Sequence, residues 1–271
     1  MKNFSNISKW FLGSVIWSAL FISLAAYSAQ KAVEADPEIE EKLSQHFSEK
    51  WGTTINVSLD ADSSDQNSDQ KKDEWIIKNS ITNIQIETIN GDIEIVTVPD
   101  KNNIQISARG KLNKKKAPRL LEVLESEKEL SITQPDQSAV KSLQLKIEIP
   151  ESYSGELIVN TVTGDFSANN FKPENIKLNS ISGDISFVDI TSNQVQLKSV
   201  SGDINLDNVL AKELESITTS GDVSIHFPGL QNDIKFDIQT VSGDIDNQNK
   251  SAGQGIRRYK VNTVSGDVEI R

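Results

Sequence analysis

The chain has 271 residues, 36% of them hydrophobic and 25% charged, which fits one elongated domain with short appendages. Its formal net charge of −11 argues against nucleic acid or an anionic bilayer as the main partner, because both would repel the protein. It contains no cysteine, which excludes disulfides, thiol chemistry and a lipid-modified N-terminal cysteine.

Residues 1–29 are typical of an export signal. Two lysines precede an uncharged run from Trp10 to Gln30, and the apolar stretch ends in the small residues AAYSA. This layout predicts a signal peptide that is cleaved after the A-Y-S sequence. The alternative is an uncleaved anchor in residues 10–29, because about 20 uncharged residues can just span a bilayer. Either way we expect an exported protein, in the periplasm or at the cell surface and, if uncleaved, tethered to the inner membrane.

Residues 30–59 are predicted to form a short helical stalk or cap. Asp36 is a suitable N-cap, and Pro37 fits the first helical position. Residues 60–74 are rich in Asp, Ser, Gln and Lys, a composition typical of an acidic flexible linker. The main domain is therefore expected at residues 75–271, beginning with Trp75.

That domain contains one motif written seven times around a Gly-Asp pair. The glycines are Gly91, Gly164, Gly183, Gly202, Gly221, Gly243 and Gly266, and the central copies are spaced by 19 residues. A fixed period of this size is typical of a solenoid, in which each repeat stacks on the one before. The apolar residues of each copy alternate, which predicts two strands per coil, and the glycine permits the positive φ of a tight corner.

A polar column runs through the repeats at an inward-facing position. Its members are Thr88, Thr161, Ser180, Ser199, Thr218, Thr240 and Thr263. By strand parity these hydroxyls should face the core and form a ladder, each bonded to a neighbour above or below. The first two repeats are separated by a longer segment, in which APRLLEVLESE predicts a helical insertion with Leu120, Leu121 and Leu124 facing the core. The predicted fold is therefore an all-β, single-domain β-solenoid with a short N-terminal helix and one helical insertion.

The residues from about Trp75 to Arg271 resemble a known family. The order is IETINGDIEI, a Lys-rich segment, a Leu-rich segment, a strand ending in proline, and then tandem T-V-S-G-D repeats. This order is similar to the bacterial putative-adhesin domain, also called the toast-rack domain. The resemblance implies a single-sheet or β-helical stack, a location in the cell envelope, and no established reaction or catalytic residues.

The aspartates of the repeats are the first candidates for chemistry. Stacked along one edge at about 4.8 Å, their carboxylates would repel one another. We expect them to accept hydrogen bonds from N–H groups of their own turns. The alternative is weak Ca²⁺ binding at Asp165, Asp184, Asp203 and Asp222, although the glycine pattern of calcium-binding β-rolls does not occur.

Catalysis is not expected. The chain has only two histidines, His46 and His226, and strand parity directs His226 to solvent. Two histidines without cysteine favour neither a catalytic triad nor a transition-metal site. We therefore predict a protein that is not an enzyme and that needs no cofactor.

Two basic spots interrupt the acidic background. The first holds Lys111, Lys114, Lys115, Lys116 and Arg119, and the second holds Arg257, Arg258 and Lys260. Both fit a solvated face, and both could contact phosphate-bearing envelope polymers such as lipopolysaccharide or teichoic acid. The last repeat is expected to leave an uncovered strand at Gly266–Arg271, where a partner or a second copy could add a strand.

These features predict a non-catalytic cell-envelope solenoid that acts as an adhesion-like binding or scaffold module. In this hypothesis the outward residues of the repeats contact an envelope polymer or an envelope protein. The alternative is an extracytoplasmic sensing or docking domain of an envelope-stress or transport system, acting through its end strand.

Overall fold

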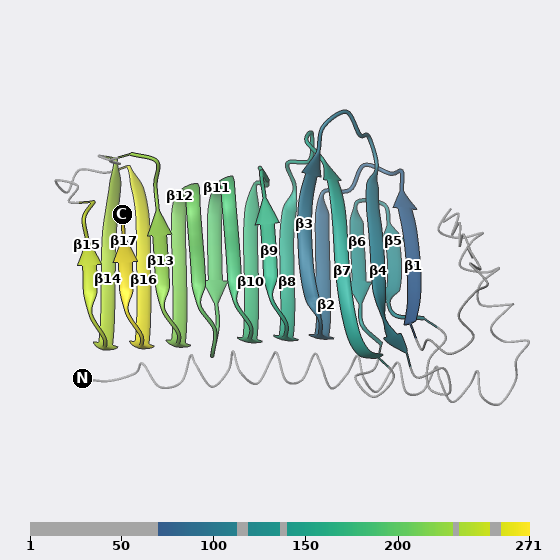
Figure 1. The fold of residues 1–271 in the computed structure, drawn as a ribbon. Helices are drawn as coiled ribbons and strands as arrows, with labels where there is room; N and C mark the ends of the chain where they lie inside the picture. The colour runs from purple at the N-terminus through teal and green to yellow at the C-terminus, as the bar shows by residue number, and fades with distance from the viewer. Residues whose placement is uncertain (1–69, 113–118, 136–139, 230–232, 250–255) are drawn as a thin grey trace, which may run out of the picture. The chain divides into compact units, whose positions relative to one another are not determined.

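A computed structural model describes residues 70–112, 119–135, 140–229, 233–249 and 256–271. These residues form seventeen β-strands that hydrogen-bond into one sheet, and no helix occurs among them (Figure 1). Accordingly, no described helix could cross a membrane. The predicted signal or anchor, the helical stalk and most of the predicted linker lie outside these residues.

The strands fall into the N-terminal part of the sheet, the regular repeats and the C-terminal part. The N-terminal strands are β1 (Gln70–Ile77), β2 (Asn83–Asn90), β3 (Asp92–Val98), β4 (Ile104–Leu112), β5 (Glu122–Ser126), β6 (Glu129–Thr133) and β7 (Val140–Pro150). The regular repeats give β8 (Glu156–Thr163), β9 (Phe166–Asn169), β10 (Asn175–Ser182), β11 (Ile185–Lys198) and β12 (Ile204–Ser220). The C-terminal strands are β13 (Val223–His226), β14 (Ile234–Ser242), β15 (Ile245–Asn247), β16 (Arg257–Ser265) and β17 (Val268–Ile270).

The repeats stack as coils, as the 19-residue period predicts. Each Gly-Asp corner joins a strand of one ladder to a strand of a second ladder. The central coils pair in parallel with an offset of 19 residues, as Ile185 with Ile204 and Val195 with Leu214 show. The first ladder runs β5–β6–β2–β8–β10–β11–β12–β16–β14, and the second runs β1–β4–β7–β3–β9–β11–β12–β13–β17–β15. Strands β11 and β12 contribute to both ladders.

The predicted helical insertion is wrong. Glu122–Ser126 forms β5, which pairs antiparallel with β6 in a hairpin. Leu120 and Leu121 are fully buried, as predicted, but Leu124 is 63% exposed and faces away from the core. Pairing with β6 overrides the helix propensity of this Leu- and Glu-rich segment, which is too short to form a stable helix alone.

Antiparallel strands close the N-terminal end of the stack. β4 pairs antiparallel with both β1 and β7, and β1 begins at Gln70, five residues before the predicted domain boundary. Trp75 of β1 is 7% exposed, and Leu120 and Leu121 are buried beside the same core. The apolar interior is therefore covered at this end.

The order of the last two coils in space differs from their order in the chain. β16 pairs with both β12 and β14, and β17 pairs with both β13 and β15. The C-terminal coil thus lies between the coils of Gly221 and Gly243 (Figure 1). The prediction that Gly266–Arg271 is an uncovered edge is wrong, and the terminal coil is instead the one formed by β14 and β15.

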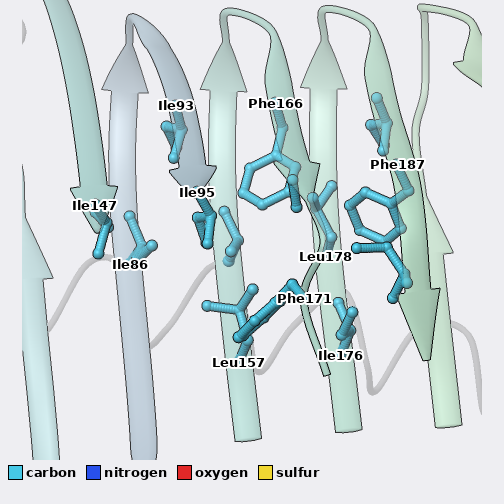
Figure 2. Packing of buried hydrophobic residues seen from close by; sticks show 14 of the residues in the cluster. Ile86, Ile93, Ile95, Ile147, Leu157, Phe166, Phe171, Ile176, Leu178 and Phe187 are labelled. Carbon is cyan, nitrogen blue, oxygen red and sulfur yellow. The ribbon is translucent and has the colours of Figure 1, made fainter. Parts of the chain in front are cut away.

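The core lies between the two ladders and is built from alternating apolar residues. Ile176, Leu178 and Phe187 are at most 1% exposed, and the rings of Phe166 and Phe187 meet edge to face at 5.7 Å (Figure 2). The polar column faces inward as predicted, since six of its seven members are buried and only Thr240 is partly exposed.

The continuous hydroxyl ladder that we expected along this column does not form. Within the column, only the Thr88 hydroxyl donates to another hydroxyl, that of Thr161, at 3.0 Å. Ser180, Ser199 and Thr218 have buried hydroxyls without a hydrogen-bond partner. At the C-terminal end, the Thr240 and Thr263 hydroxyls donate instead to the carbonyls of Gly266 and Gly221 in the neighbouring coils. The central coils therefore pair without help from this column.

Two buried tyrosines use their hydroxyls to bond backbone groups. The Tyr153 hydroxyl donates to the Glu156 carbonyl at 2.7 Å, and the Tyr259 hydroxyl donates to the Val209 carbonyl at the same distance. The Tyr259 hydroxyl also accepts from the Ala211 N–H at 2.9 Å, so it ties the C-terminal coil to β12. Burial raises the pKa of both tyrosines above the usual value of 10.0.

This shift predicts a loss of stability in alkali. The pKa of each tyrosine is higher in the folded state than in the unfolded state, so the unfolded state releases these protons more readily. The contribution of the two tyrosines to the free energy of unfolding is therefore full below pH 10 and is lost as the pH rises above it. We expect the urea midpoint to fall above pH 10, and to fall less steeply in the double variant Tyr153→Phe, Tyr259→Phe. Equal slopes for the two proteins would contradict this assignment.

Candidate functional site

The Gly-Asp corner requires glycine for two reasons. All seven glycines have a φ between 119° and 155°. In addition, a Cβ on Gly202 would lie 2.2 Å from the carbonyl oxygen of Gly183 in the next coil, and the other corners are equally crowded. The sequence reveals the first reason, but only the stacking reveals the second.

The aspartates after these glycines form a hydrogen-bonded ladder. The N–H of Asp184 donates to Asp165 Oδ1 at 2.9 Å, and the N–H of Asp203 donates to Asp184 Oδ1 at 2.8 Å. The ladder continues in spatial order through Asp222 and Asp267 to Asp244. Each carboxylate therefore caps the next coil rather than its own turn, which corrects the predicted local capping.

The predicted calcium ligands, Asp165, Asp184, Asp203 and Asp222, all stand in this ladder, where one oxygen of each carboxylate already accepts an N–H. Among the residues that the structure describes, no three acidic or histidine side chains gather as a metal-binding group. The ladder explains how neighbouring carboxylates tolerate one another, because each one before the terminal Asp244 receives a charge-assisted hydrogen bond.

An exposed apolar row borders the same corner. It consists of the residues two positions before six of the seven glycines, with Thr219 interrupting the row before Gly221, and its most exposed members are Val162, Ile181, Val200, Val264 and Val241. Ile181 and Val200 are each 51% exposed. Sequence reasoning missed this row, although the recurring Val or Ile before Ser-Gly-Asp was a usable signal.

A second corner, opposite in the coil, also escaped sequence reasoning. Asn170, Asp189 and Asn208 are spaced by 19 residues and have φ values of 53° to 54°. Asparagine and aspartate tolerate this left-handed conformation better than other residues with a Cβ. Together with Lys172 and Thr191 they line a polar groove of about 450 Å³.

A group of cations that we call the basic cluster lies on the antiparallel strands at the N-terminal end. It comprises Lys72 of β1, Arg109 and Lys111 of β4, and Lys141 of β7. All four side chains are exposed and line one groove of about 890 Å³. Lys72 stands directly opposite Arg109 in the β1–β4 register, an arrangement of like charges that destabilises a sheet.

The basic cluster is only partly neutralised. Lys72 contacts Glu74, but within the described part of the chain Arg109, Lys111 and Lys141 make no ion pair. Asp92 also lines the groove. Of these four cations the sequence had singled out only Lys111, because the others are distant in the chain and meet only through strand pairing.

The other sequence-predicted basic residues are distributed differently. Lys114, Lys115 and Lys116 lie outside the described residues, and Arg119 is exposed beside the buried Leu120. Arg257 pairs with Asp233 at 3.4 Å, and Arg258 pairs with Glu213 at 3.8 Å. The second spot is therefore compensated, whereas the first extends into the basic cluster.

Acidic partners also engage Lys260 and His226. Hydrogen bonds from Gln196 and then Lys260 hold the pKa of Glu215 below its usual value. His226 is exposed, as predicted, and its Nδ1 lies 2.8 Å from Asp207 Oδ1 on the neighbouring coil. This pair stands on the outer surface of β12 and β13, away from the core.

The fold defines a class of all-β proteins in which Gly-Asp repeats stack as parallel coils. Residues 81–271 match the family model described as Toastrack DUF4097, and the chain belongs to this toast-rack family. No curated protein matches the chain significantly.

Three solved structures illustrate the likeness. A "putative cell adhesion protein" from Clostridium sporogenes is 14% identical, with 74% of this chain and 98% of that chain covered and a TM-score of 0.48. A "putative adhesin" from Bacteroides fragilis is also 14% identical, with coverage of 74% and 97% and a TM-score of 0.44. A "putative lipid binding protein" from Parabacteroides distasonis is 16% identical, with coverage of 76% and 98% and a TM-score of 0.37.

Proposed function

We propose that this protein is an exported, non-catalytic β-solenoid of the cell envelope that acts as an adhesion-like binding module. Export is supported by the sequence of residues 1–29, in which lysines precede a long uncharged run. The ligand that fits best is a phosphate-bearing envelope polymer, bound at the basic cluster.

The observation that carries this proposal is the convergence of four cations, only partly neutralised, on one groove. Elsewhere in the chain of net charge −11, cations are either paired with acids, as Arg257 and Arg258 are, or dispersed over the surface. Lys72 and Arg109 instead face each other across two strands, and Lys111 and Lys141 add positive charge to the same groove. A phosphate held between these side chains would relieve their repulsion and form charge-assisted hydrogen bonds.

The test compares two variants of the full chain that lose the same charge. The cluster variant carries Arg109→Gln, Lys111→Gln and Lys141→Gln, and the matched control carries Arg257→Gln, Arg258→Gln and Lys260→Gln. Binding to immobilised lipopolysaccharide and to teichoic acid is measured at several salt concentrations, with dephosphorylated polymer as a second control.

We expect the cluster variant to bind on the order of 100-fold more weakly, because each cation lost beside a polyanion costs about 1 kcal/mol. Its affinity should also depend less on salt. The control variant should bind almost as well as the unmodified protein. If both variants lose affinity equally, or if removal of phosphate changes nothing, the basic cluster is not the binding site.

A further inference from the structure

The two ends of the stack differ in whether further strands cover them. At the N-terminal end, antiparallel strands cover the core, as described above. At the other end, β14 pairs only with β16, and β15 pairs only with β17, within the part of the chain that the structure describes. These two strands are the open end.

The core is incompletely covered at the open end. Phe236 and Ile238 of β14 are partly exposed, and Ile245 of β15 is 48% exposed. Their counterparts one coil further in, Tyr259, Val261 and Val268, are at most 1% exposed. Among the described strands, none adds over these inward-facing apolar side chains the layer that each inner coil receives.

The backbone of the open end is oriented to accept a strand. The Arg257 N–H donates to the Asp233 carbonyl, so odd-numbered residues of β14 direct their backbone groups toward β16. The backbone groups of Phe236 and Ile238 consequently point to the open side. By the same reasoning, the Gln248 N–H donates to Ile270, which leaves the backbone groups of Asn247 pointing to the open side.

This edge has only part of the usual protection against pairing, namely the exposed charges Lys235 and Asp237 of β14 and the shortness of β15. The register of β14 with β16 runs unbroken from Ile234 to Thr240, without a bulge, and the strand contains no proline. Natural edge strands are commonly blunted by such features when they must stay single.

We propose that the open end binds a second copy of this chain, with β14 of each copy pairing antiparallel about Ile238. A two-fold axis there places Asp237 opposite Gln239 of the partner, so a carboxylate meets a carboxamide. Ile238 and Asn247 lie equally far along the chain from the corner at Ser242–Gly243. The same axis therefore places Asp246 of β15 opposite Gln248 of the partner, again an acid against an amide.

The register is also consistent with the hydrogen bonds. Ile238 meets Ile238 of the partner as a hydrogen-bonded pair, which requires the backbone orientation derived above. Asp237 and Gln239 then form a pair without backbone hydrogen bonds, in which opposite side chains are closest. The dimer would cover Phe236 and Ile238 and would carry one basic cluster at each far end, which favours binding to a repetitive polymer.

Cysteine cross-linking of the full chain in mild detergent tests this register, and the chain has no native cysteine to interfere. The double variant Asp237→Cys, Gln239→Cys is expected to give a disulfide-linked dimer that reductant dissolves. Each single variant should remain uncross-linked, because its cysteines would be offset by two residues, and cysteines at 237 and 239 of one strand are too far apart to bridge. A double variant that stays monomeric overturns the proposal.

A second measurement keeps the test independent of disulfide chemistry. Gln239→Lys should create two ion pairs per dimer and lower the dissociation constant severalfold, whereas Gln239→Glu should oppose two pairs of carboxylates and raise it severalfold. Both are measured by sedimentation of the full chain. If the two variants shift the constant in the same direction, or if unmodified protein is monomeric throughout, the open end does not bind a second copy.

Discussion

Replacing Gly202 with alanine is expected to lower the free energy of unfolding by about 3 kcal/mol or more. The φ of Gly202 is 135°, a conformation that residues with a Cβ rarely adopt. The new methyl group would also lie 2.2 Å from the Gly183 carbonyl oxygen, so the two coils would have to separate locally. Urea denaturation followed by circular dichroism measures the loss.

Gly229 supplies a matched control for this substitution. A Cβ at Gly229 meets no heavy atom within 4 Å, and its φ does not lie in the positive range that excludes side chains. Gly229→Ala should therefore change the free energy of unfolding by less than about 0.5 kcal/mol. Similar losses for the two variants would show that stacking at the corner does not limit stability.

Removing a single oxygen atom should have an effect of comparable size at Tyr259. Tyr259→Phe leaves the Val209 carbonyl and the Ala211 N–H without the hydroxyl that bonds to both. Because an unsatisfied buried backbone group costs about 1–3 kcal/mol, we expect a loss of about 3 kcal/mol at neutral pH. The same denaturation measurement applies.

Tyr153→Phe is a comparison in which no distant coil is held. The Tyr153 hydroxyl donates to the Glu156 carbonyl, three residues away, and the backbone of Ile84 also forms a hydrogen bond to it. Its removal should therefore also cost about 3 kcal/mol. If Tyr259→Phe costs less than about 0.5 kcal/mol, the two hydrogen bonds of Tyr259 do not fasten the C-terminal coil in the way described.

Much of the fold could be predicted because the repeats are short-range signals. Alternating residues such as Ile176 and Leu178 fix which face of a strand is buried, and the 19-residue period fixes the register of neighbouring coils. The corner glycines are readable from the same pattern. Local sequence was misleading at β5, where Leu and Glu favour a helix but the partner strand β6 determines the outcome.

The order of the last coils was not predictable from the repeats. The copies around Gly243 and Gly266 share the T-V-S-G-D motif, so either could stack on the coil of Gly221 with the same register. The choice depends on contacts outside the motif, of which the Tyr259 hydroxyl bonds to β12 are the clearest. A repeat period shows which coils are equivalent, but it does not show which of them stack on each other.

The candidate site was only partly predictable for a related reason. Lys111 stood out in a lysine-rich stretch, whereas Lys72 belongs to a short Lys-Lys pair followed by two acids and Lys141 is a single cation in its strand. They converge because β1 and β7 both pair with β4 in antiparallel fashion. The exposed row that includes Val162 and Ile181 was missed for a different reason. Its repeat spacing is visible in the sequence, but the direction in which side chains point beside a corner cannot be read from that spacing.

The position of the C-terminal coil has a consequence for biosynthesis. A chain is made, and in this case we propose exported, with its N-terminus first, so coils up to β13 can stack as they emerge. β14 and β15 emerge next, but their native neighbours are the last strands to arrive. Until Arg257–Ile270 is released, β12 and β13 present an unfinished edge. The final segment therefore completes the stack. A chain that stops short of it would be left with unpaired edge strands that can aggregate.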